Sequence, residues 1–128
     1  MTRKEDMSAL RADTQTHYNC AQAVIIPFAE DLGLSREQAN ALGLNFGGGM
    51  GCGSMCGAVT GALMVLGGLD QPQEKRVELL RRFRAENGAV DCAALLKAAF
   101  ERGEQKKAHC DRMIRQCVDF VCQETGLE

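Results

Sequence analysis

Residues 45–61 read NFGGGMGCGSMCGAVTG, and this stretch decides how the chain is expected to fold. Five of the seven residues from 47 to 53 are glycine, and glycine loses more conformational freedom on ordering than any other residue. We therefore expect an irregular glycine-rich loop here rather than a helix or a strand. An apolar helical pattern follows the loop, and Ser54 is the predicted N-cap of a helix that ends near Leu66.

The glycines of this stretch are candidates for a cofactor-binding backbone. Gly57 and Gly61 lie one turn apart on the predicted helix, so another helix or a ligand can approach that face closely. The loop glycines Gly47, Gly48 and Gly49 leave backbone N–H groups free to surround an anion or a metal-bound sulfur. We expect these five glycines to contact a cofactor. The plain alternative is that they only allow tight helix packing.

The rest of the chain has helical periodicity, and no run of residues alternates with the period of a strand. The predicted helices cover residues 8–32 with a kink at Pro27, 35–42, 72–87, 92–102 and 104–125. Ser35 and Gln38 form a capping-box pattern, and Asp91 is a predicted N-cap. The fold class is therefore all-α, with one domain over residues 1–128: a compact bundle of about five to six helices with the glycine-rich loop before the Cys56 helix.

Charge and hydropathy exclude several classes of function. The chain carries 15 Lys and Arg against 17 Asp and Glu, interspersed along its 128 residues, which is unlike the basic stripe of a nucleic-acid-binding protein. The longest apolar run, from Cys56 to Leu69, is about 14 residues and too short to cross a bilayer. The polar N-terminus does not resemble a signal peptide. We expect a cytoplasmic protein with no nucleic-acid partner and no membrane span.

The chemistry of the chain is expected to reside in its cysteines. There are seven: Cys20, Cys52, Cys56, Cys92, Cys110, Cys117 and Cys122. In a reducing cytoplasm, cysteines serve more often as metal ligands or redox groups than as structural disulfides. Cys56 and Cys92 fall in the first turn of predicted helices, where the helix dipole stabilises a thiolate and lowers the thiol pKa. We therefore predict these two to be the most thiolate-like.

The other cysteines are placed by the same helical periodicity. Cys20 and Cys110 lie on core-directed faces, so four thiols from four segments are predicted to meet. His17 and His109 lie near them in sequence and are candidate ligands. For Cys117 and Cys122 the favoured interpretation is simple packing, since a free cysteine behaves as a small hydrophobe. The same interpretation stays open for each of the others.

One motif points to a family. Cys56–Gly61 reads CGAVTG, and it is flanked by YNCAQAV at 18–24, FGGGMG at 46–51 and GALMVLG at 61–67. On these motifs the chain resembles the bacterial and archaeal family called C_GCAxxG_C_C, whose members are described as redox-active. The resemblance implies that the characteristic cysteines are Cys20, Cys56, Cys92 and Cys110, and that Cys52, Cys117 and Cys122 are additions. Asp111 follows Cys110 where the family pattern has proline.

Three functions stay open at this point. The first is redox activity: the four cysteines could hold an iron–sulfur cluster, as the resemblance to the iron–sulfur part of split-Soret cytochromes implies. Without metal, they could form a reversible disulfide in which Cys56 attacks and Cys20, Cys92 or Cys110 resolves, serving an unknown redox partner. The second is a zinc site, which the absence of any C-x-x-C pair disfavours. The third is a helical interaction module, forming a homodimer, with packing cysteines.

Whether the protein is an enzyme stays undecided by its sequence. A nucleophilic role for Cys56 in hydrolysis or group transfer is poorly supported, because no histidine is placed by sequence to act as its base. The glycine-rich loop also lacks the lysine and the serine or threonine of a phosphate-binding loop.

Overall fold

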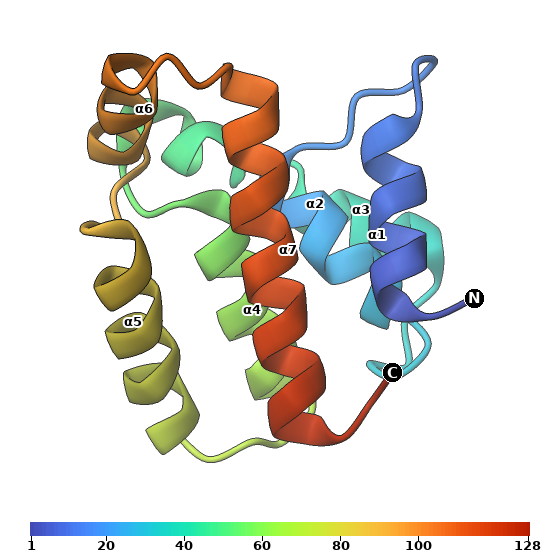
Figure 1. Ribbon diagram of the computed structural model, residues 1–128. Helices are drawn as coiled ribbons and strands as arrows, with labels where there is room; N and C mark the ends of the chain where they lie inside the picture. Colours follow the sequence, from blue (N-terminus) through green and yellow to red (C-terminus); the bar gives the residue numbers. More distant parts are fainter.

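The computed structural model describes all residues from 1 to 128 and contains helices without any strand (Figure 1). The all-α class is confirmed, and the bundle has seven α-helices rather than five to six. A 3₁₀ turn, η1, follows α2, and a left-handed turn, η2, precedes α4. In chain order the elements are α1 Arg3–Ala12, α2 Cys20–Ile25, η1 Ile26–Phe28, α3 Arg36–Gly43, η2 Gly49–Gly53, α4 Gly57–Gly68, α5 Glu74–Asn87, α6 Cys92–Glu101 and α7 Lys106–Thr125.

The single helix predicted over residues 8–32 is wrong, because residues 13–19 form a loop between α1 and α2. The Asp13 carboxylate accepts hydrogen bonds from the backbone N–H groups of residues 15 and 16, at 2.7 and 3.0 Å. The α2 helix then starts with a capping box: Asn19 accepts from the Gln22 N–H at 2.8 Å, and Gln22 accepts from the Asn19 N–H at 2.9 Å. These local side-chain bonds compete with a continuous helix.

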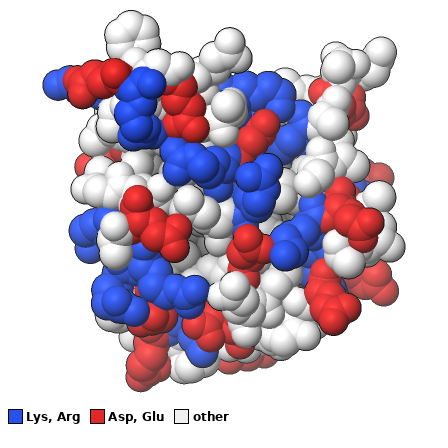
Figure 2. Space-filling model, viewed as in Figure 1, with Lys and Arg blue, Asp and Glu red and all other residues white.

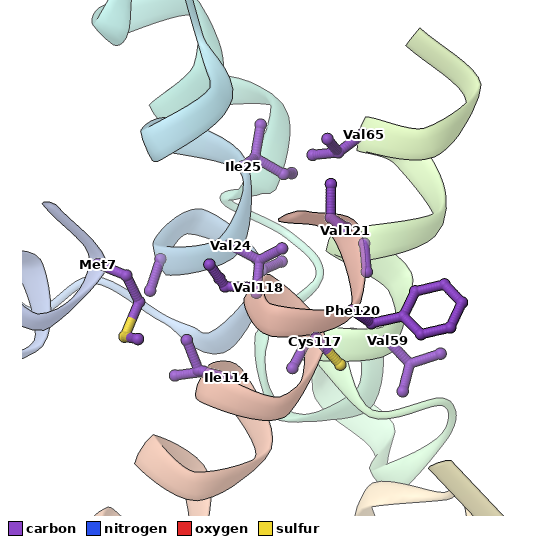
Figure 3. Close-up of a cluster of buried hydrophobic side chains, with 14 of the residues drawn as sticks. Met7, Val24, Ile25, Val59, Val65, Ile114, Cys117, Val118, Phe120 and Val121 are labelled. Carbon is purple, nitrogen blue, oxygen red and sulfur yellow. The ribbon is translucent and has the colours of Figure 1, made fainter. Parts of the chain in front are cut away.

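The hydrophobic core lies where α7 crosses α2 and α4 (Figure 1, Figure 3). Its central side chains are at most 1% exposed, and they come from all three helices: Val24 and Ile25, Val59 and Val65, and Ile114, Cys117, Val118 and Val121. Cys117 is fully buried among them, so its predicted role as a packing residue fits its position. Cys122 is half-buried at the edge of the same core.

Two glycines allow α2 and α4 to approach closely. A Cβ atom at Gly57 would lie 3.2 Å from the Cys20 Cβ atom of α2, and one at Gly61 would lie 3.1 Å from the Ala21 carbonyl oxygen of α2. The Gly57 Cβ would also lie 2.7 Å from the Phe46 carbonyl oxygen, in the segment between α3 and η2. Real Cβ contacts are longer, so any larger residue would push the two helices apart. The predicted approach of another helix to this face of α4 is thus confirmed.

The glycine-rich loop folds into a left-handed turn. Four consecutive residues from Gly48 to Gly51 have φ values of 63°, 63°, 60° and 70°. Three of them are glycine, which adopts this conformation readily, whereas Met50 does so at a cost of about 1 kcal/mol. The loop occurs where it was expected, but the predicted N-cap at Ser54 is wrong. Cys56 is the N-cap and α4 begins at Gly57.

The later helix boundaries follow the sequence signals within two residues. Asp91 is the N-cap of α6. Gly88 and Gly126 end α5 and α7 with φ values of 82° and 74°. The α5 and α7 helices begin at Glu74 and Lys106, slightly after the predicted starts. None of the helices combines the length and the apolar composition that a membrane crossing requires.

Candidate functional site

A cavity of about 560 Å³ lies at the end of the bundle where α2, α4 and α6 begin. Its wall includes the side chains of Cys20, Cys56, Cys92 and Cys110, each from a different helix or its cap. The structure therefore brings these four cysteines to one cavity. The other three lie elsewhere: Cys52 is exposed on the glycine-rich loop, and Cys117 and Cys122 belong to the core.

A short antiparallel bridge sets Cys56 beside Cys92. The bridge pairs Met55 with Asp91. The Cys56 N–H donates to the Val90 carbonyl at 2.8 Å, and the Cys92 N–H donates to the Ser54 carbonyl at 2.6 Å. These two bonds join the start of α4 to the start of α6. They also explain why Ser54 does not cap α4, since its backbone is committed to the bridge.

Arg11 fixes the position of Cys20 relative to Cys110. Its side chain is only 9% exposed, and its guanidinium donates to the Asp111 carboxylate at 2.6 Å. The same group donates to the Tyr18 carbonyl at 2.8 Å. One buried cation thus ties the chain just before α2 to the first turns of α7. The Cys20 and Cys110 thiols lie close enough that each shifts the pKa of the other.

Within this pair, Cys110 is the acidic member. Interaction with the neighbouring Cys20 thiol, helped by the charges of Arg11 and Lys106, lowers the pKa of Cys110 to about 7 against the opposing effect of partial burial. The same interaction, together with burial, raises the pKa of Cys20. At neutral pH Cys110 is therefore the thiol of the pair that is partly ionised, whereas Cys20 stays protonated.

The prediction that Cys56 and Cys92 are the most thiolate-like is wrong. Burial raises the pKa of Cys56 to about 11, although the nearby backbone N–H groups of Val59 and Ala58 oppose the shift. Burial also raises the pKa of Cys92, and the nearby Cys110 adds to the effect. Both residues do sit at helix starts, but the loss of hydration outweighs the stabilisation by the helix dipole.

The polar groups near the thiols do not form a site for a single metal ion. No three of the His, Cys, Asp and Glu side chains are arranged to hold one ion, which gives the zinc interpretation no geometric support. Both histidines line the cavity. His109 is 3% exposed, its Nδ1 atom has no hydrogen-bond partner, and this atom lies 3.5 Å from the Glu104 carboxylate. Burial lowers the pKa of His109.

Of the five glycines expected to contact a cofactor, Gly48 and Gly57 line the cavity. The other three have close protein neighbours: a Cβ atom would lie within 3.1 Å of other residues at Gly47, Gly49 and Gly61. A cofactor-binding role for the five stays a prediction.

Comparison with known proteins adds a family to this geometry. The family model described as "Putative redox-active protein (C_GCAxxG_C_C)" matches residues 18–124. The chain belongs to this family. The description indicates a redox-active protein, and the matched range contains every cysteine that lines the cavity. The same comparison finds no match among curated proteins, and none among solved structures.

Two features of this C_GCAxxG_C_C protein lie outside the sequence prediction: the loop at residues 13–19 and the cations Arg11 and Lys106. The sequence does contain a pattern that predicts the loop, because Asn19 and Gln22 match a capping box that starts a new helix. The position of Lys106 near Cys110 is also predictable, since it precedes Cys110 by four residues and so shares its helix face. No sequence pattern predicts the role of Arg11, because its contact with Asp111 joins residues a hundred positions apart.

Proposed function

We propose that the protein is a thiol–disulfide redox protein in which Cys110 and Cys20 form a reversible disulfide. The observation that carries this proposal is that the two thiols, one from α7 and one from α2, line the same cavity and lie close enough for each to shift the pKa of the other. The family description supports redox activity. The unequal acidity of the two sulfurs supports a division of roles between them.

The reaction follows from those roles. The Cys110 thiolate attacks one sulfur of a substrate disulfide, the substrate S–S bond breaks, and one substrate thiolate leaves. Cys20 then loses its proton to solvent or to that leaving group and attacks the Cys110 sulfur, which releases the second substrate thiolate. The protein is oxidised by two electrons and the substrate is reduced to two thiols. A dithiol reductant reverses both steps and restores the free cysteines.

The proposal also covers the protonation state of the other two cavity cysteines and the compartment in which the protein works. Cys56 and Cys92 line the same cavity and stay protonated, because burial raises the pKa of both. We expect the protein to work in the cytoplasm, where reducing conditions return the pair to its dithiol form.

The proposal is tested by counting free thiols after equilibration with mixtures of reduced and oxidised dithiothreitol. The unaltered protein should lose two thiols in one reversible step. Cys110→Ser and Cys20→Ser should each abolish that step. The exposed Cys52 lies outside the cavity, so Cys52→Ser is a matched control that should still lose two. Loss of two thiols in both cavity variants would refute the assignment.

A second candidate is an iron–sulfur protein, and one observation favours it. Cys20, Cys56, Cys92 and Cys110 line the same cavity, so a cluster with several iron atoms could bond all four without their meeting at one ion. Four cysteine thiolates are the usual donor set. When bound, such a cluster would supply one-electron transfer, and the chain's own part is to hold it and exclude water.

Anaerobic reconstitution with iron and sulfide tests this second candidate. A visible absorbance that is lost in each of the four Cys→Ser variants, and kept in Cys52→Ser, would support a cluster. A colourless protein that still loses two thiols in one reversible step would contradict the cluster and leave the dithiol function as the only supported candidate.

A further inference from the structure

We propose that the cavity selects small anionic disulfides and holds their carboxylate beside the Cys20–Cys110 pair. This inference rests on the proposed thiol–disulfide function and adds the charge of the substrate to it. It is carried by the side chains and helix ends that surround the two thiols.

Cationic side chains outnumber carboxylates on the cavity wall. Arg11, Lys106 and Lys107 line it, whereas Asp13 is the only carboxylate that does. The Asp13 carboxylate is engaged by backbone N–H groups of its own loop, at 2.7 and 3.0 Å. The wall as a whole is therefore electropositive.

One of these cations is free to bind a ligand. Arg11 and Lys107 share the Asp111 carboxylate, at 2.6 and 2.9 Å. Lys106 is exposed and forms no ion pair or hydrogen bond of its own. It precedes Cys110 by one helical turn, which puts its charge near the attacking sulfur; it is one of the groups that lower the pKa of Cys110.

Helix starts add to the positive potential. The first residues of α4, α6 and α7, which are Gly57, Cys92 and Lys106, all line the cavity. The first turn of a helix carries unpaired N–H groups and the positive end of the dipole, and both favour an anion.

The dimensions of the cavity favour a small molecule over a folded protein. Its volume of about 560 Å³ lies within the usual range for small-molecule sites, about 300–1,000 Å³. The surrounding surface favours anions as well, because Lys and Arg side chains gather over the upper part of α7 (Figure 2). Charges of one sign around a cleft raise the local concentration of oppositely charged ligands.

The test uses three aliphatic disulfides of different charge: dithiodiglycolate (anionic), bis(2-hydroxyethyl) disulfide (neutral) and cystamine (cationic). The rate at which each converts Cys20 and Cys110 to a disulfide is followed by mass spectrometry and divided by its rate with a free small thiol. We expect the normalised rates to fall in the order anionic, neutral, cationic, with the anionic probe preferred over the cationic one by about tenfold. Added salt should shrink this preference.

Two variants test whether the preference for the anionic probe arises from a cation that lines the cavity. Lys106→Gln should lower the anionic rate several-fold more than the neutral rate. The neutral probe corrects for any change in the thiolate content of Cys110, because that change affects all three probes equally. Lys97 is exposed on α6 and does not line the cavity, so Lys97→Gln should leave every ratio unchanged.

The outcomes separate the two proposals. Equal normalised rates for the three probes, or ratios unmoved by Lys106→Gln, would overturn the preference for anions and leave the thiol–disulfide function standing. Failure of every probe to produce the Cys20–Cys110 disulfide would overturn both.

Discussion

Cys110 and Cys117 lie seven residues apart on the same helix, and they differ in almost every chemical property. Cys117 is 0% exposed and packs among Val59 and Val118 in the core (Figure 3). Burial raises its pKa well above the ordinary value. Cys110 is half-buried at the cavity, where a second thiol and two cations lower its pKa to about 7. The same side chain packs as a small hydrophobe in one place and is the proposed nucleophile in the other.

The comparison extends to the two regions of the bundle in which these cysteines lie. The core around Cys117 is built mainly from aliphatic side chains of α2, α4 and α7. The cavity is lined by the first residues of several helices, by cationic side chains and by the loop before α2, and it is open to small molecules. Stability should therefore depend mainly on the first region and thiol chemistry on the second.

The largest expected difference is in alkylation by iodoacetamide near neutral pH. Cys110 should react in the native protein, whereas Cys117 should react only when the core opens. Since global unfolding typically costs about 5–15 kcal/mol, the rates should differ about a thousandfold or more. Mass spectrometry of the alkylated peptides over time measures both rates. Similar rates at the two positions would remove the distinction between them.

The next effect concerns stability. Ile114 is 0% exposed in the core, so Ile114→Ala should lower the free energy of unfolding by about 2–5 kcal/mol. Leu96 is half-buried at the cavity wall, and Leu96→Ala should cost about 1 kcal/mol because less apolar surface loses its burial. Urea denaturation measures both values. Equal losses would show that the cavity end is packed as tightly as the core.

A third pair of variants tests the contact that joins the two regions. Gly57→Ala should cost about 1–3 kcal/mol, because the new methyl group would meet the Phe46 carbonyl oxygen at 2.7 Å. Gly67 lies on the same helix, and a Cβ atom added there would have no neighbouring atom within 4 Å. Gly67→Ala should therefore raise stability by about 0.5–1 kcal/mol. Thermal or urea unfolding of the two variants should show opposite signs, and a shared sign would contradict the close packing around Gly57 at the start of α4.

The smallest expected effect is on the pH dependence of the Cys110 reaction. Because the pKa of Cys110 is lowered to about 7, its alkylation rate should reach half its maximum near pH 7 and fall below that pH as the thiolate is protonated. In urea the midpoint should move up toward the ordinary thiol value of about 8.5. Lys106→Gln should move the native midpoint upward, by less than about one pH unit. A native midpoint equal to that in urea would show that the cavity does not stabilise the thiolate.

Local signals in the sequence predicted much of the fold. Ser35 and Gln38 do form the capping box that opens α3, and Gly126 ends α7. Each of these signals depends only on residues a few positions away. The all-α class and the glycine-rich loop were predictable for the same reason.

The failures involve partners that are distant in sequence. Ser54 has the right side chain for an N-cap, but its carbonyl accepts a hydrogen bond from Cys92 instead. Cys56 does lie at a helix start, yet its pKa is decided by the core residues that bury it. The acidity of Cys110 depends on Cys20 and Arg11, about ninety and a hundred positions earlier in the chain, and no local pattern reports such neighbours.

The disulfide map of the mildly oxidised protein tests the central claim most directly. After treatment with a limiting amount of oxidised dithiothreitol, blocking of the free thiols and proteolysis, mass spectrometry identifies the linked peptides. A bond between the peptides that contain Cys20 and Cys110 is the predicted result. A bond between Cys56 and Cys92, with Cys20 and Cys110 both recovered as free thiols, would contradict it.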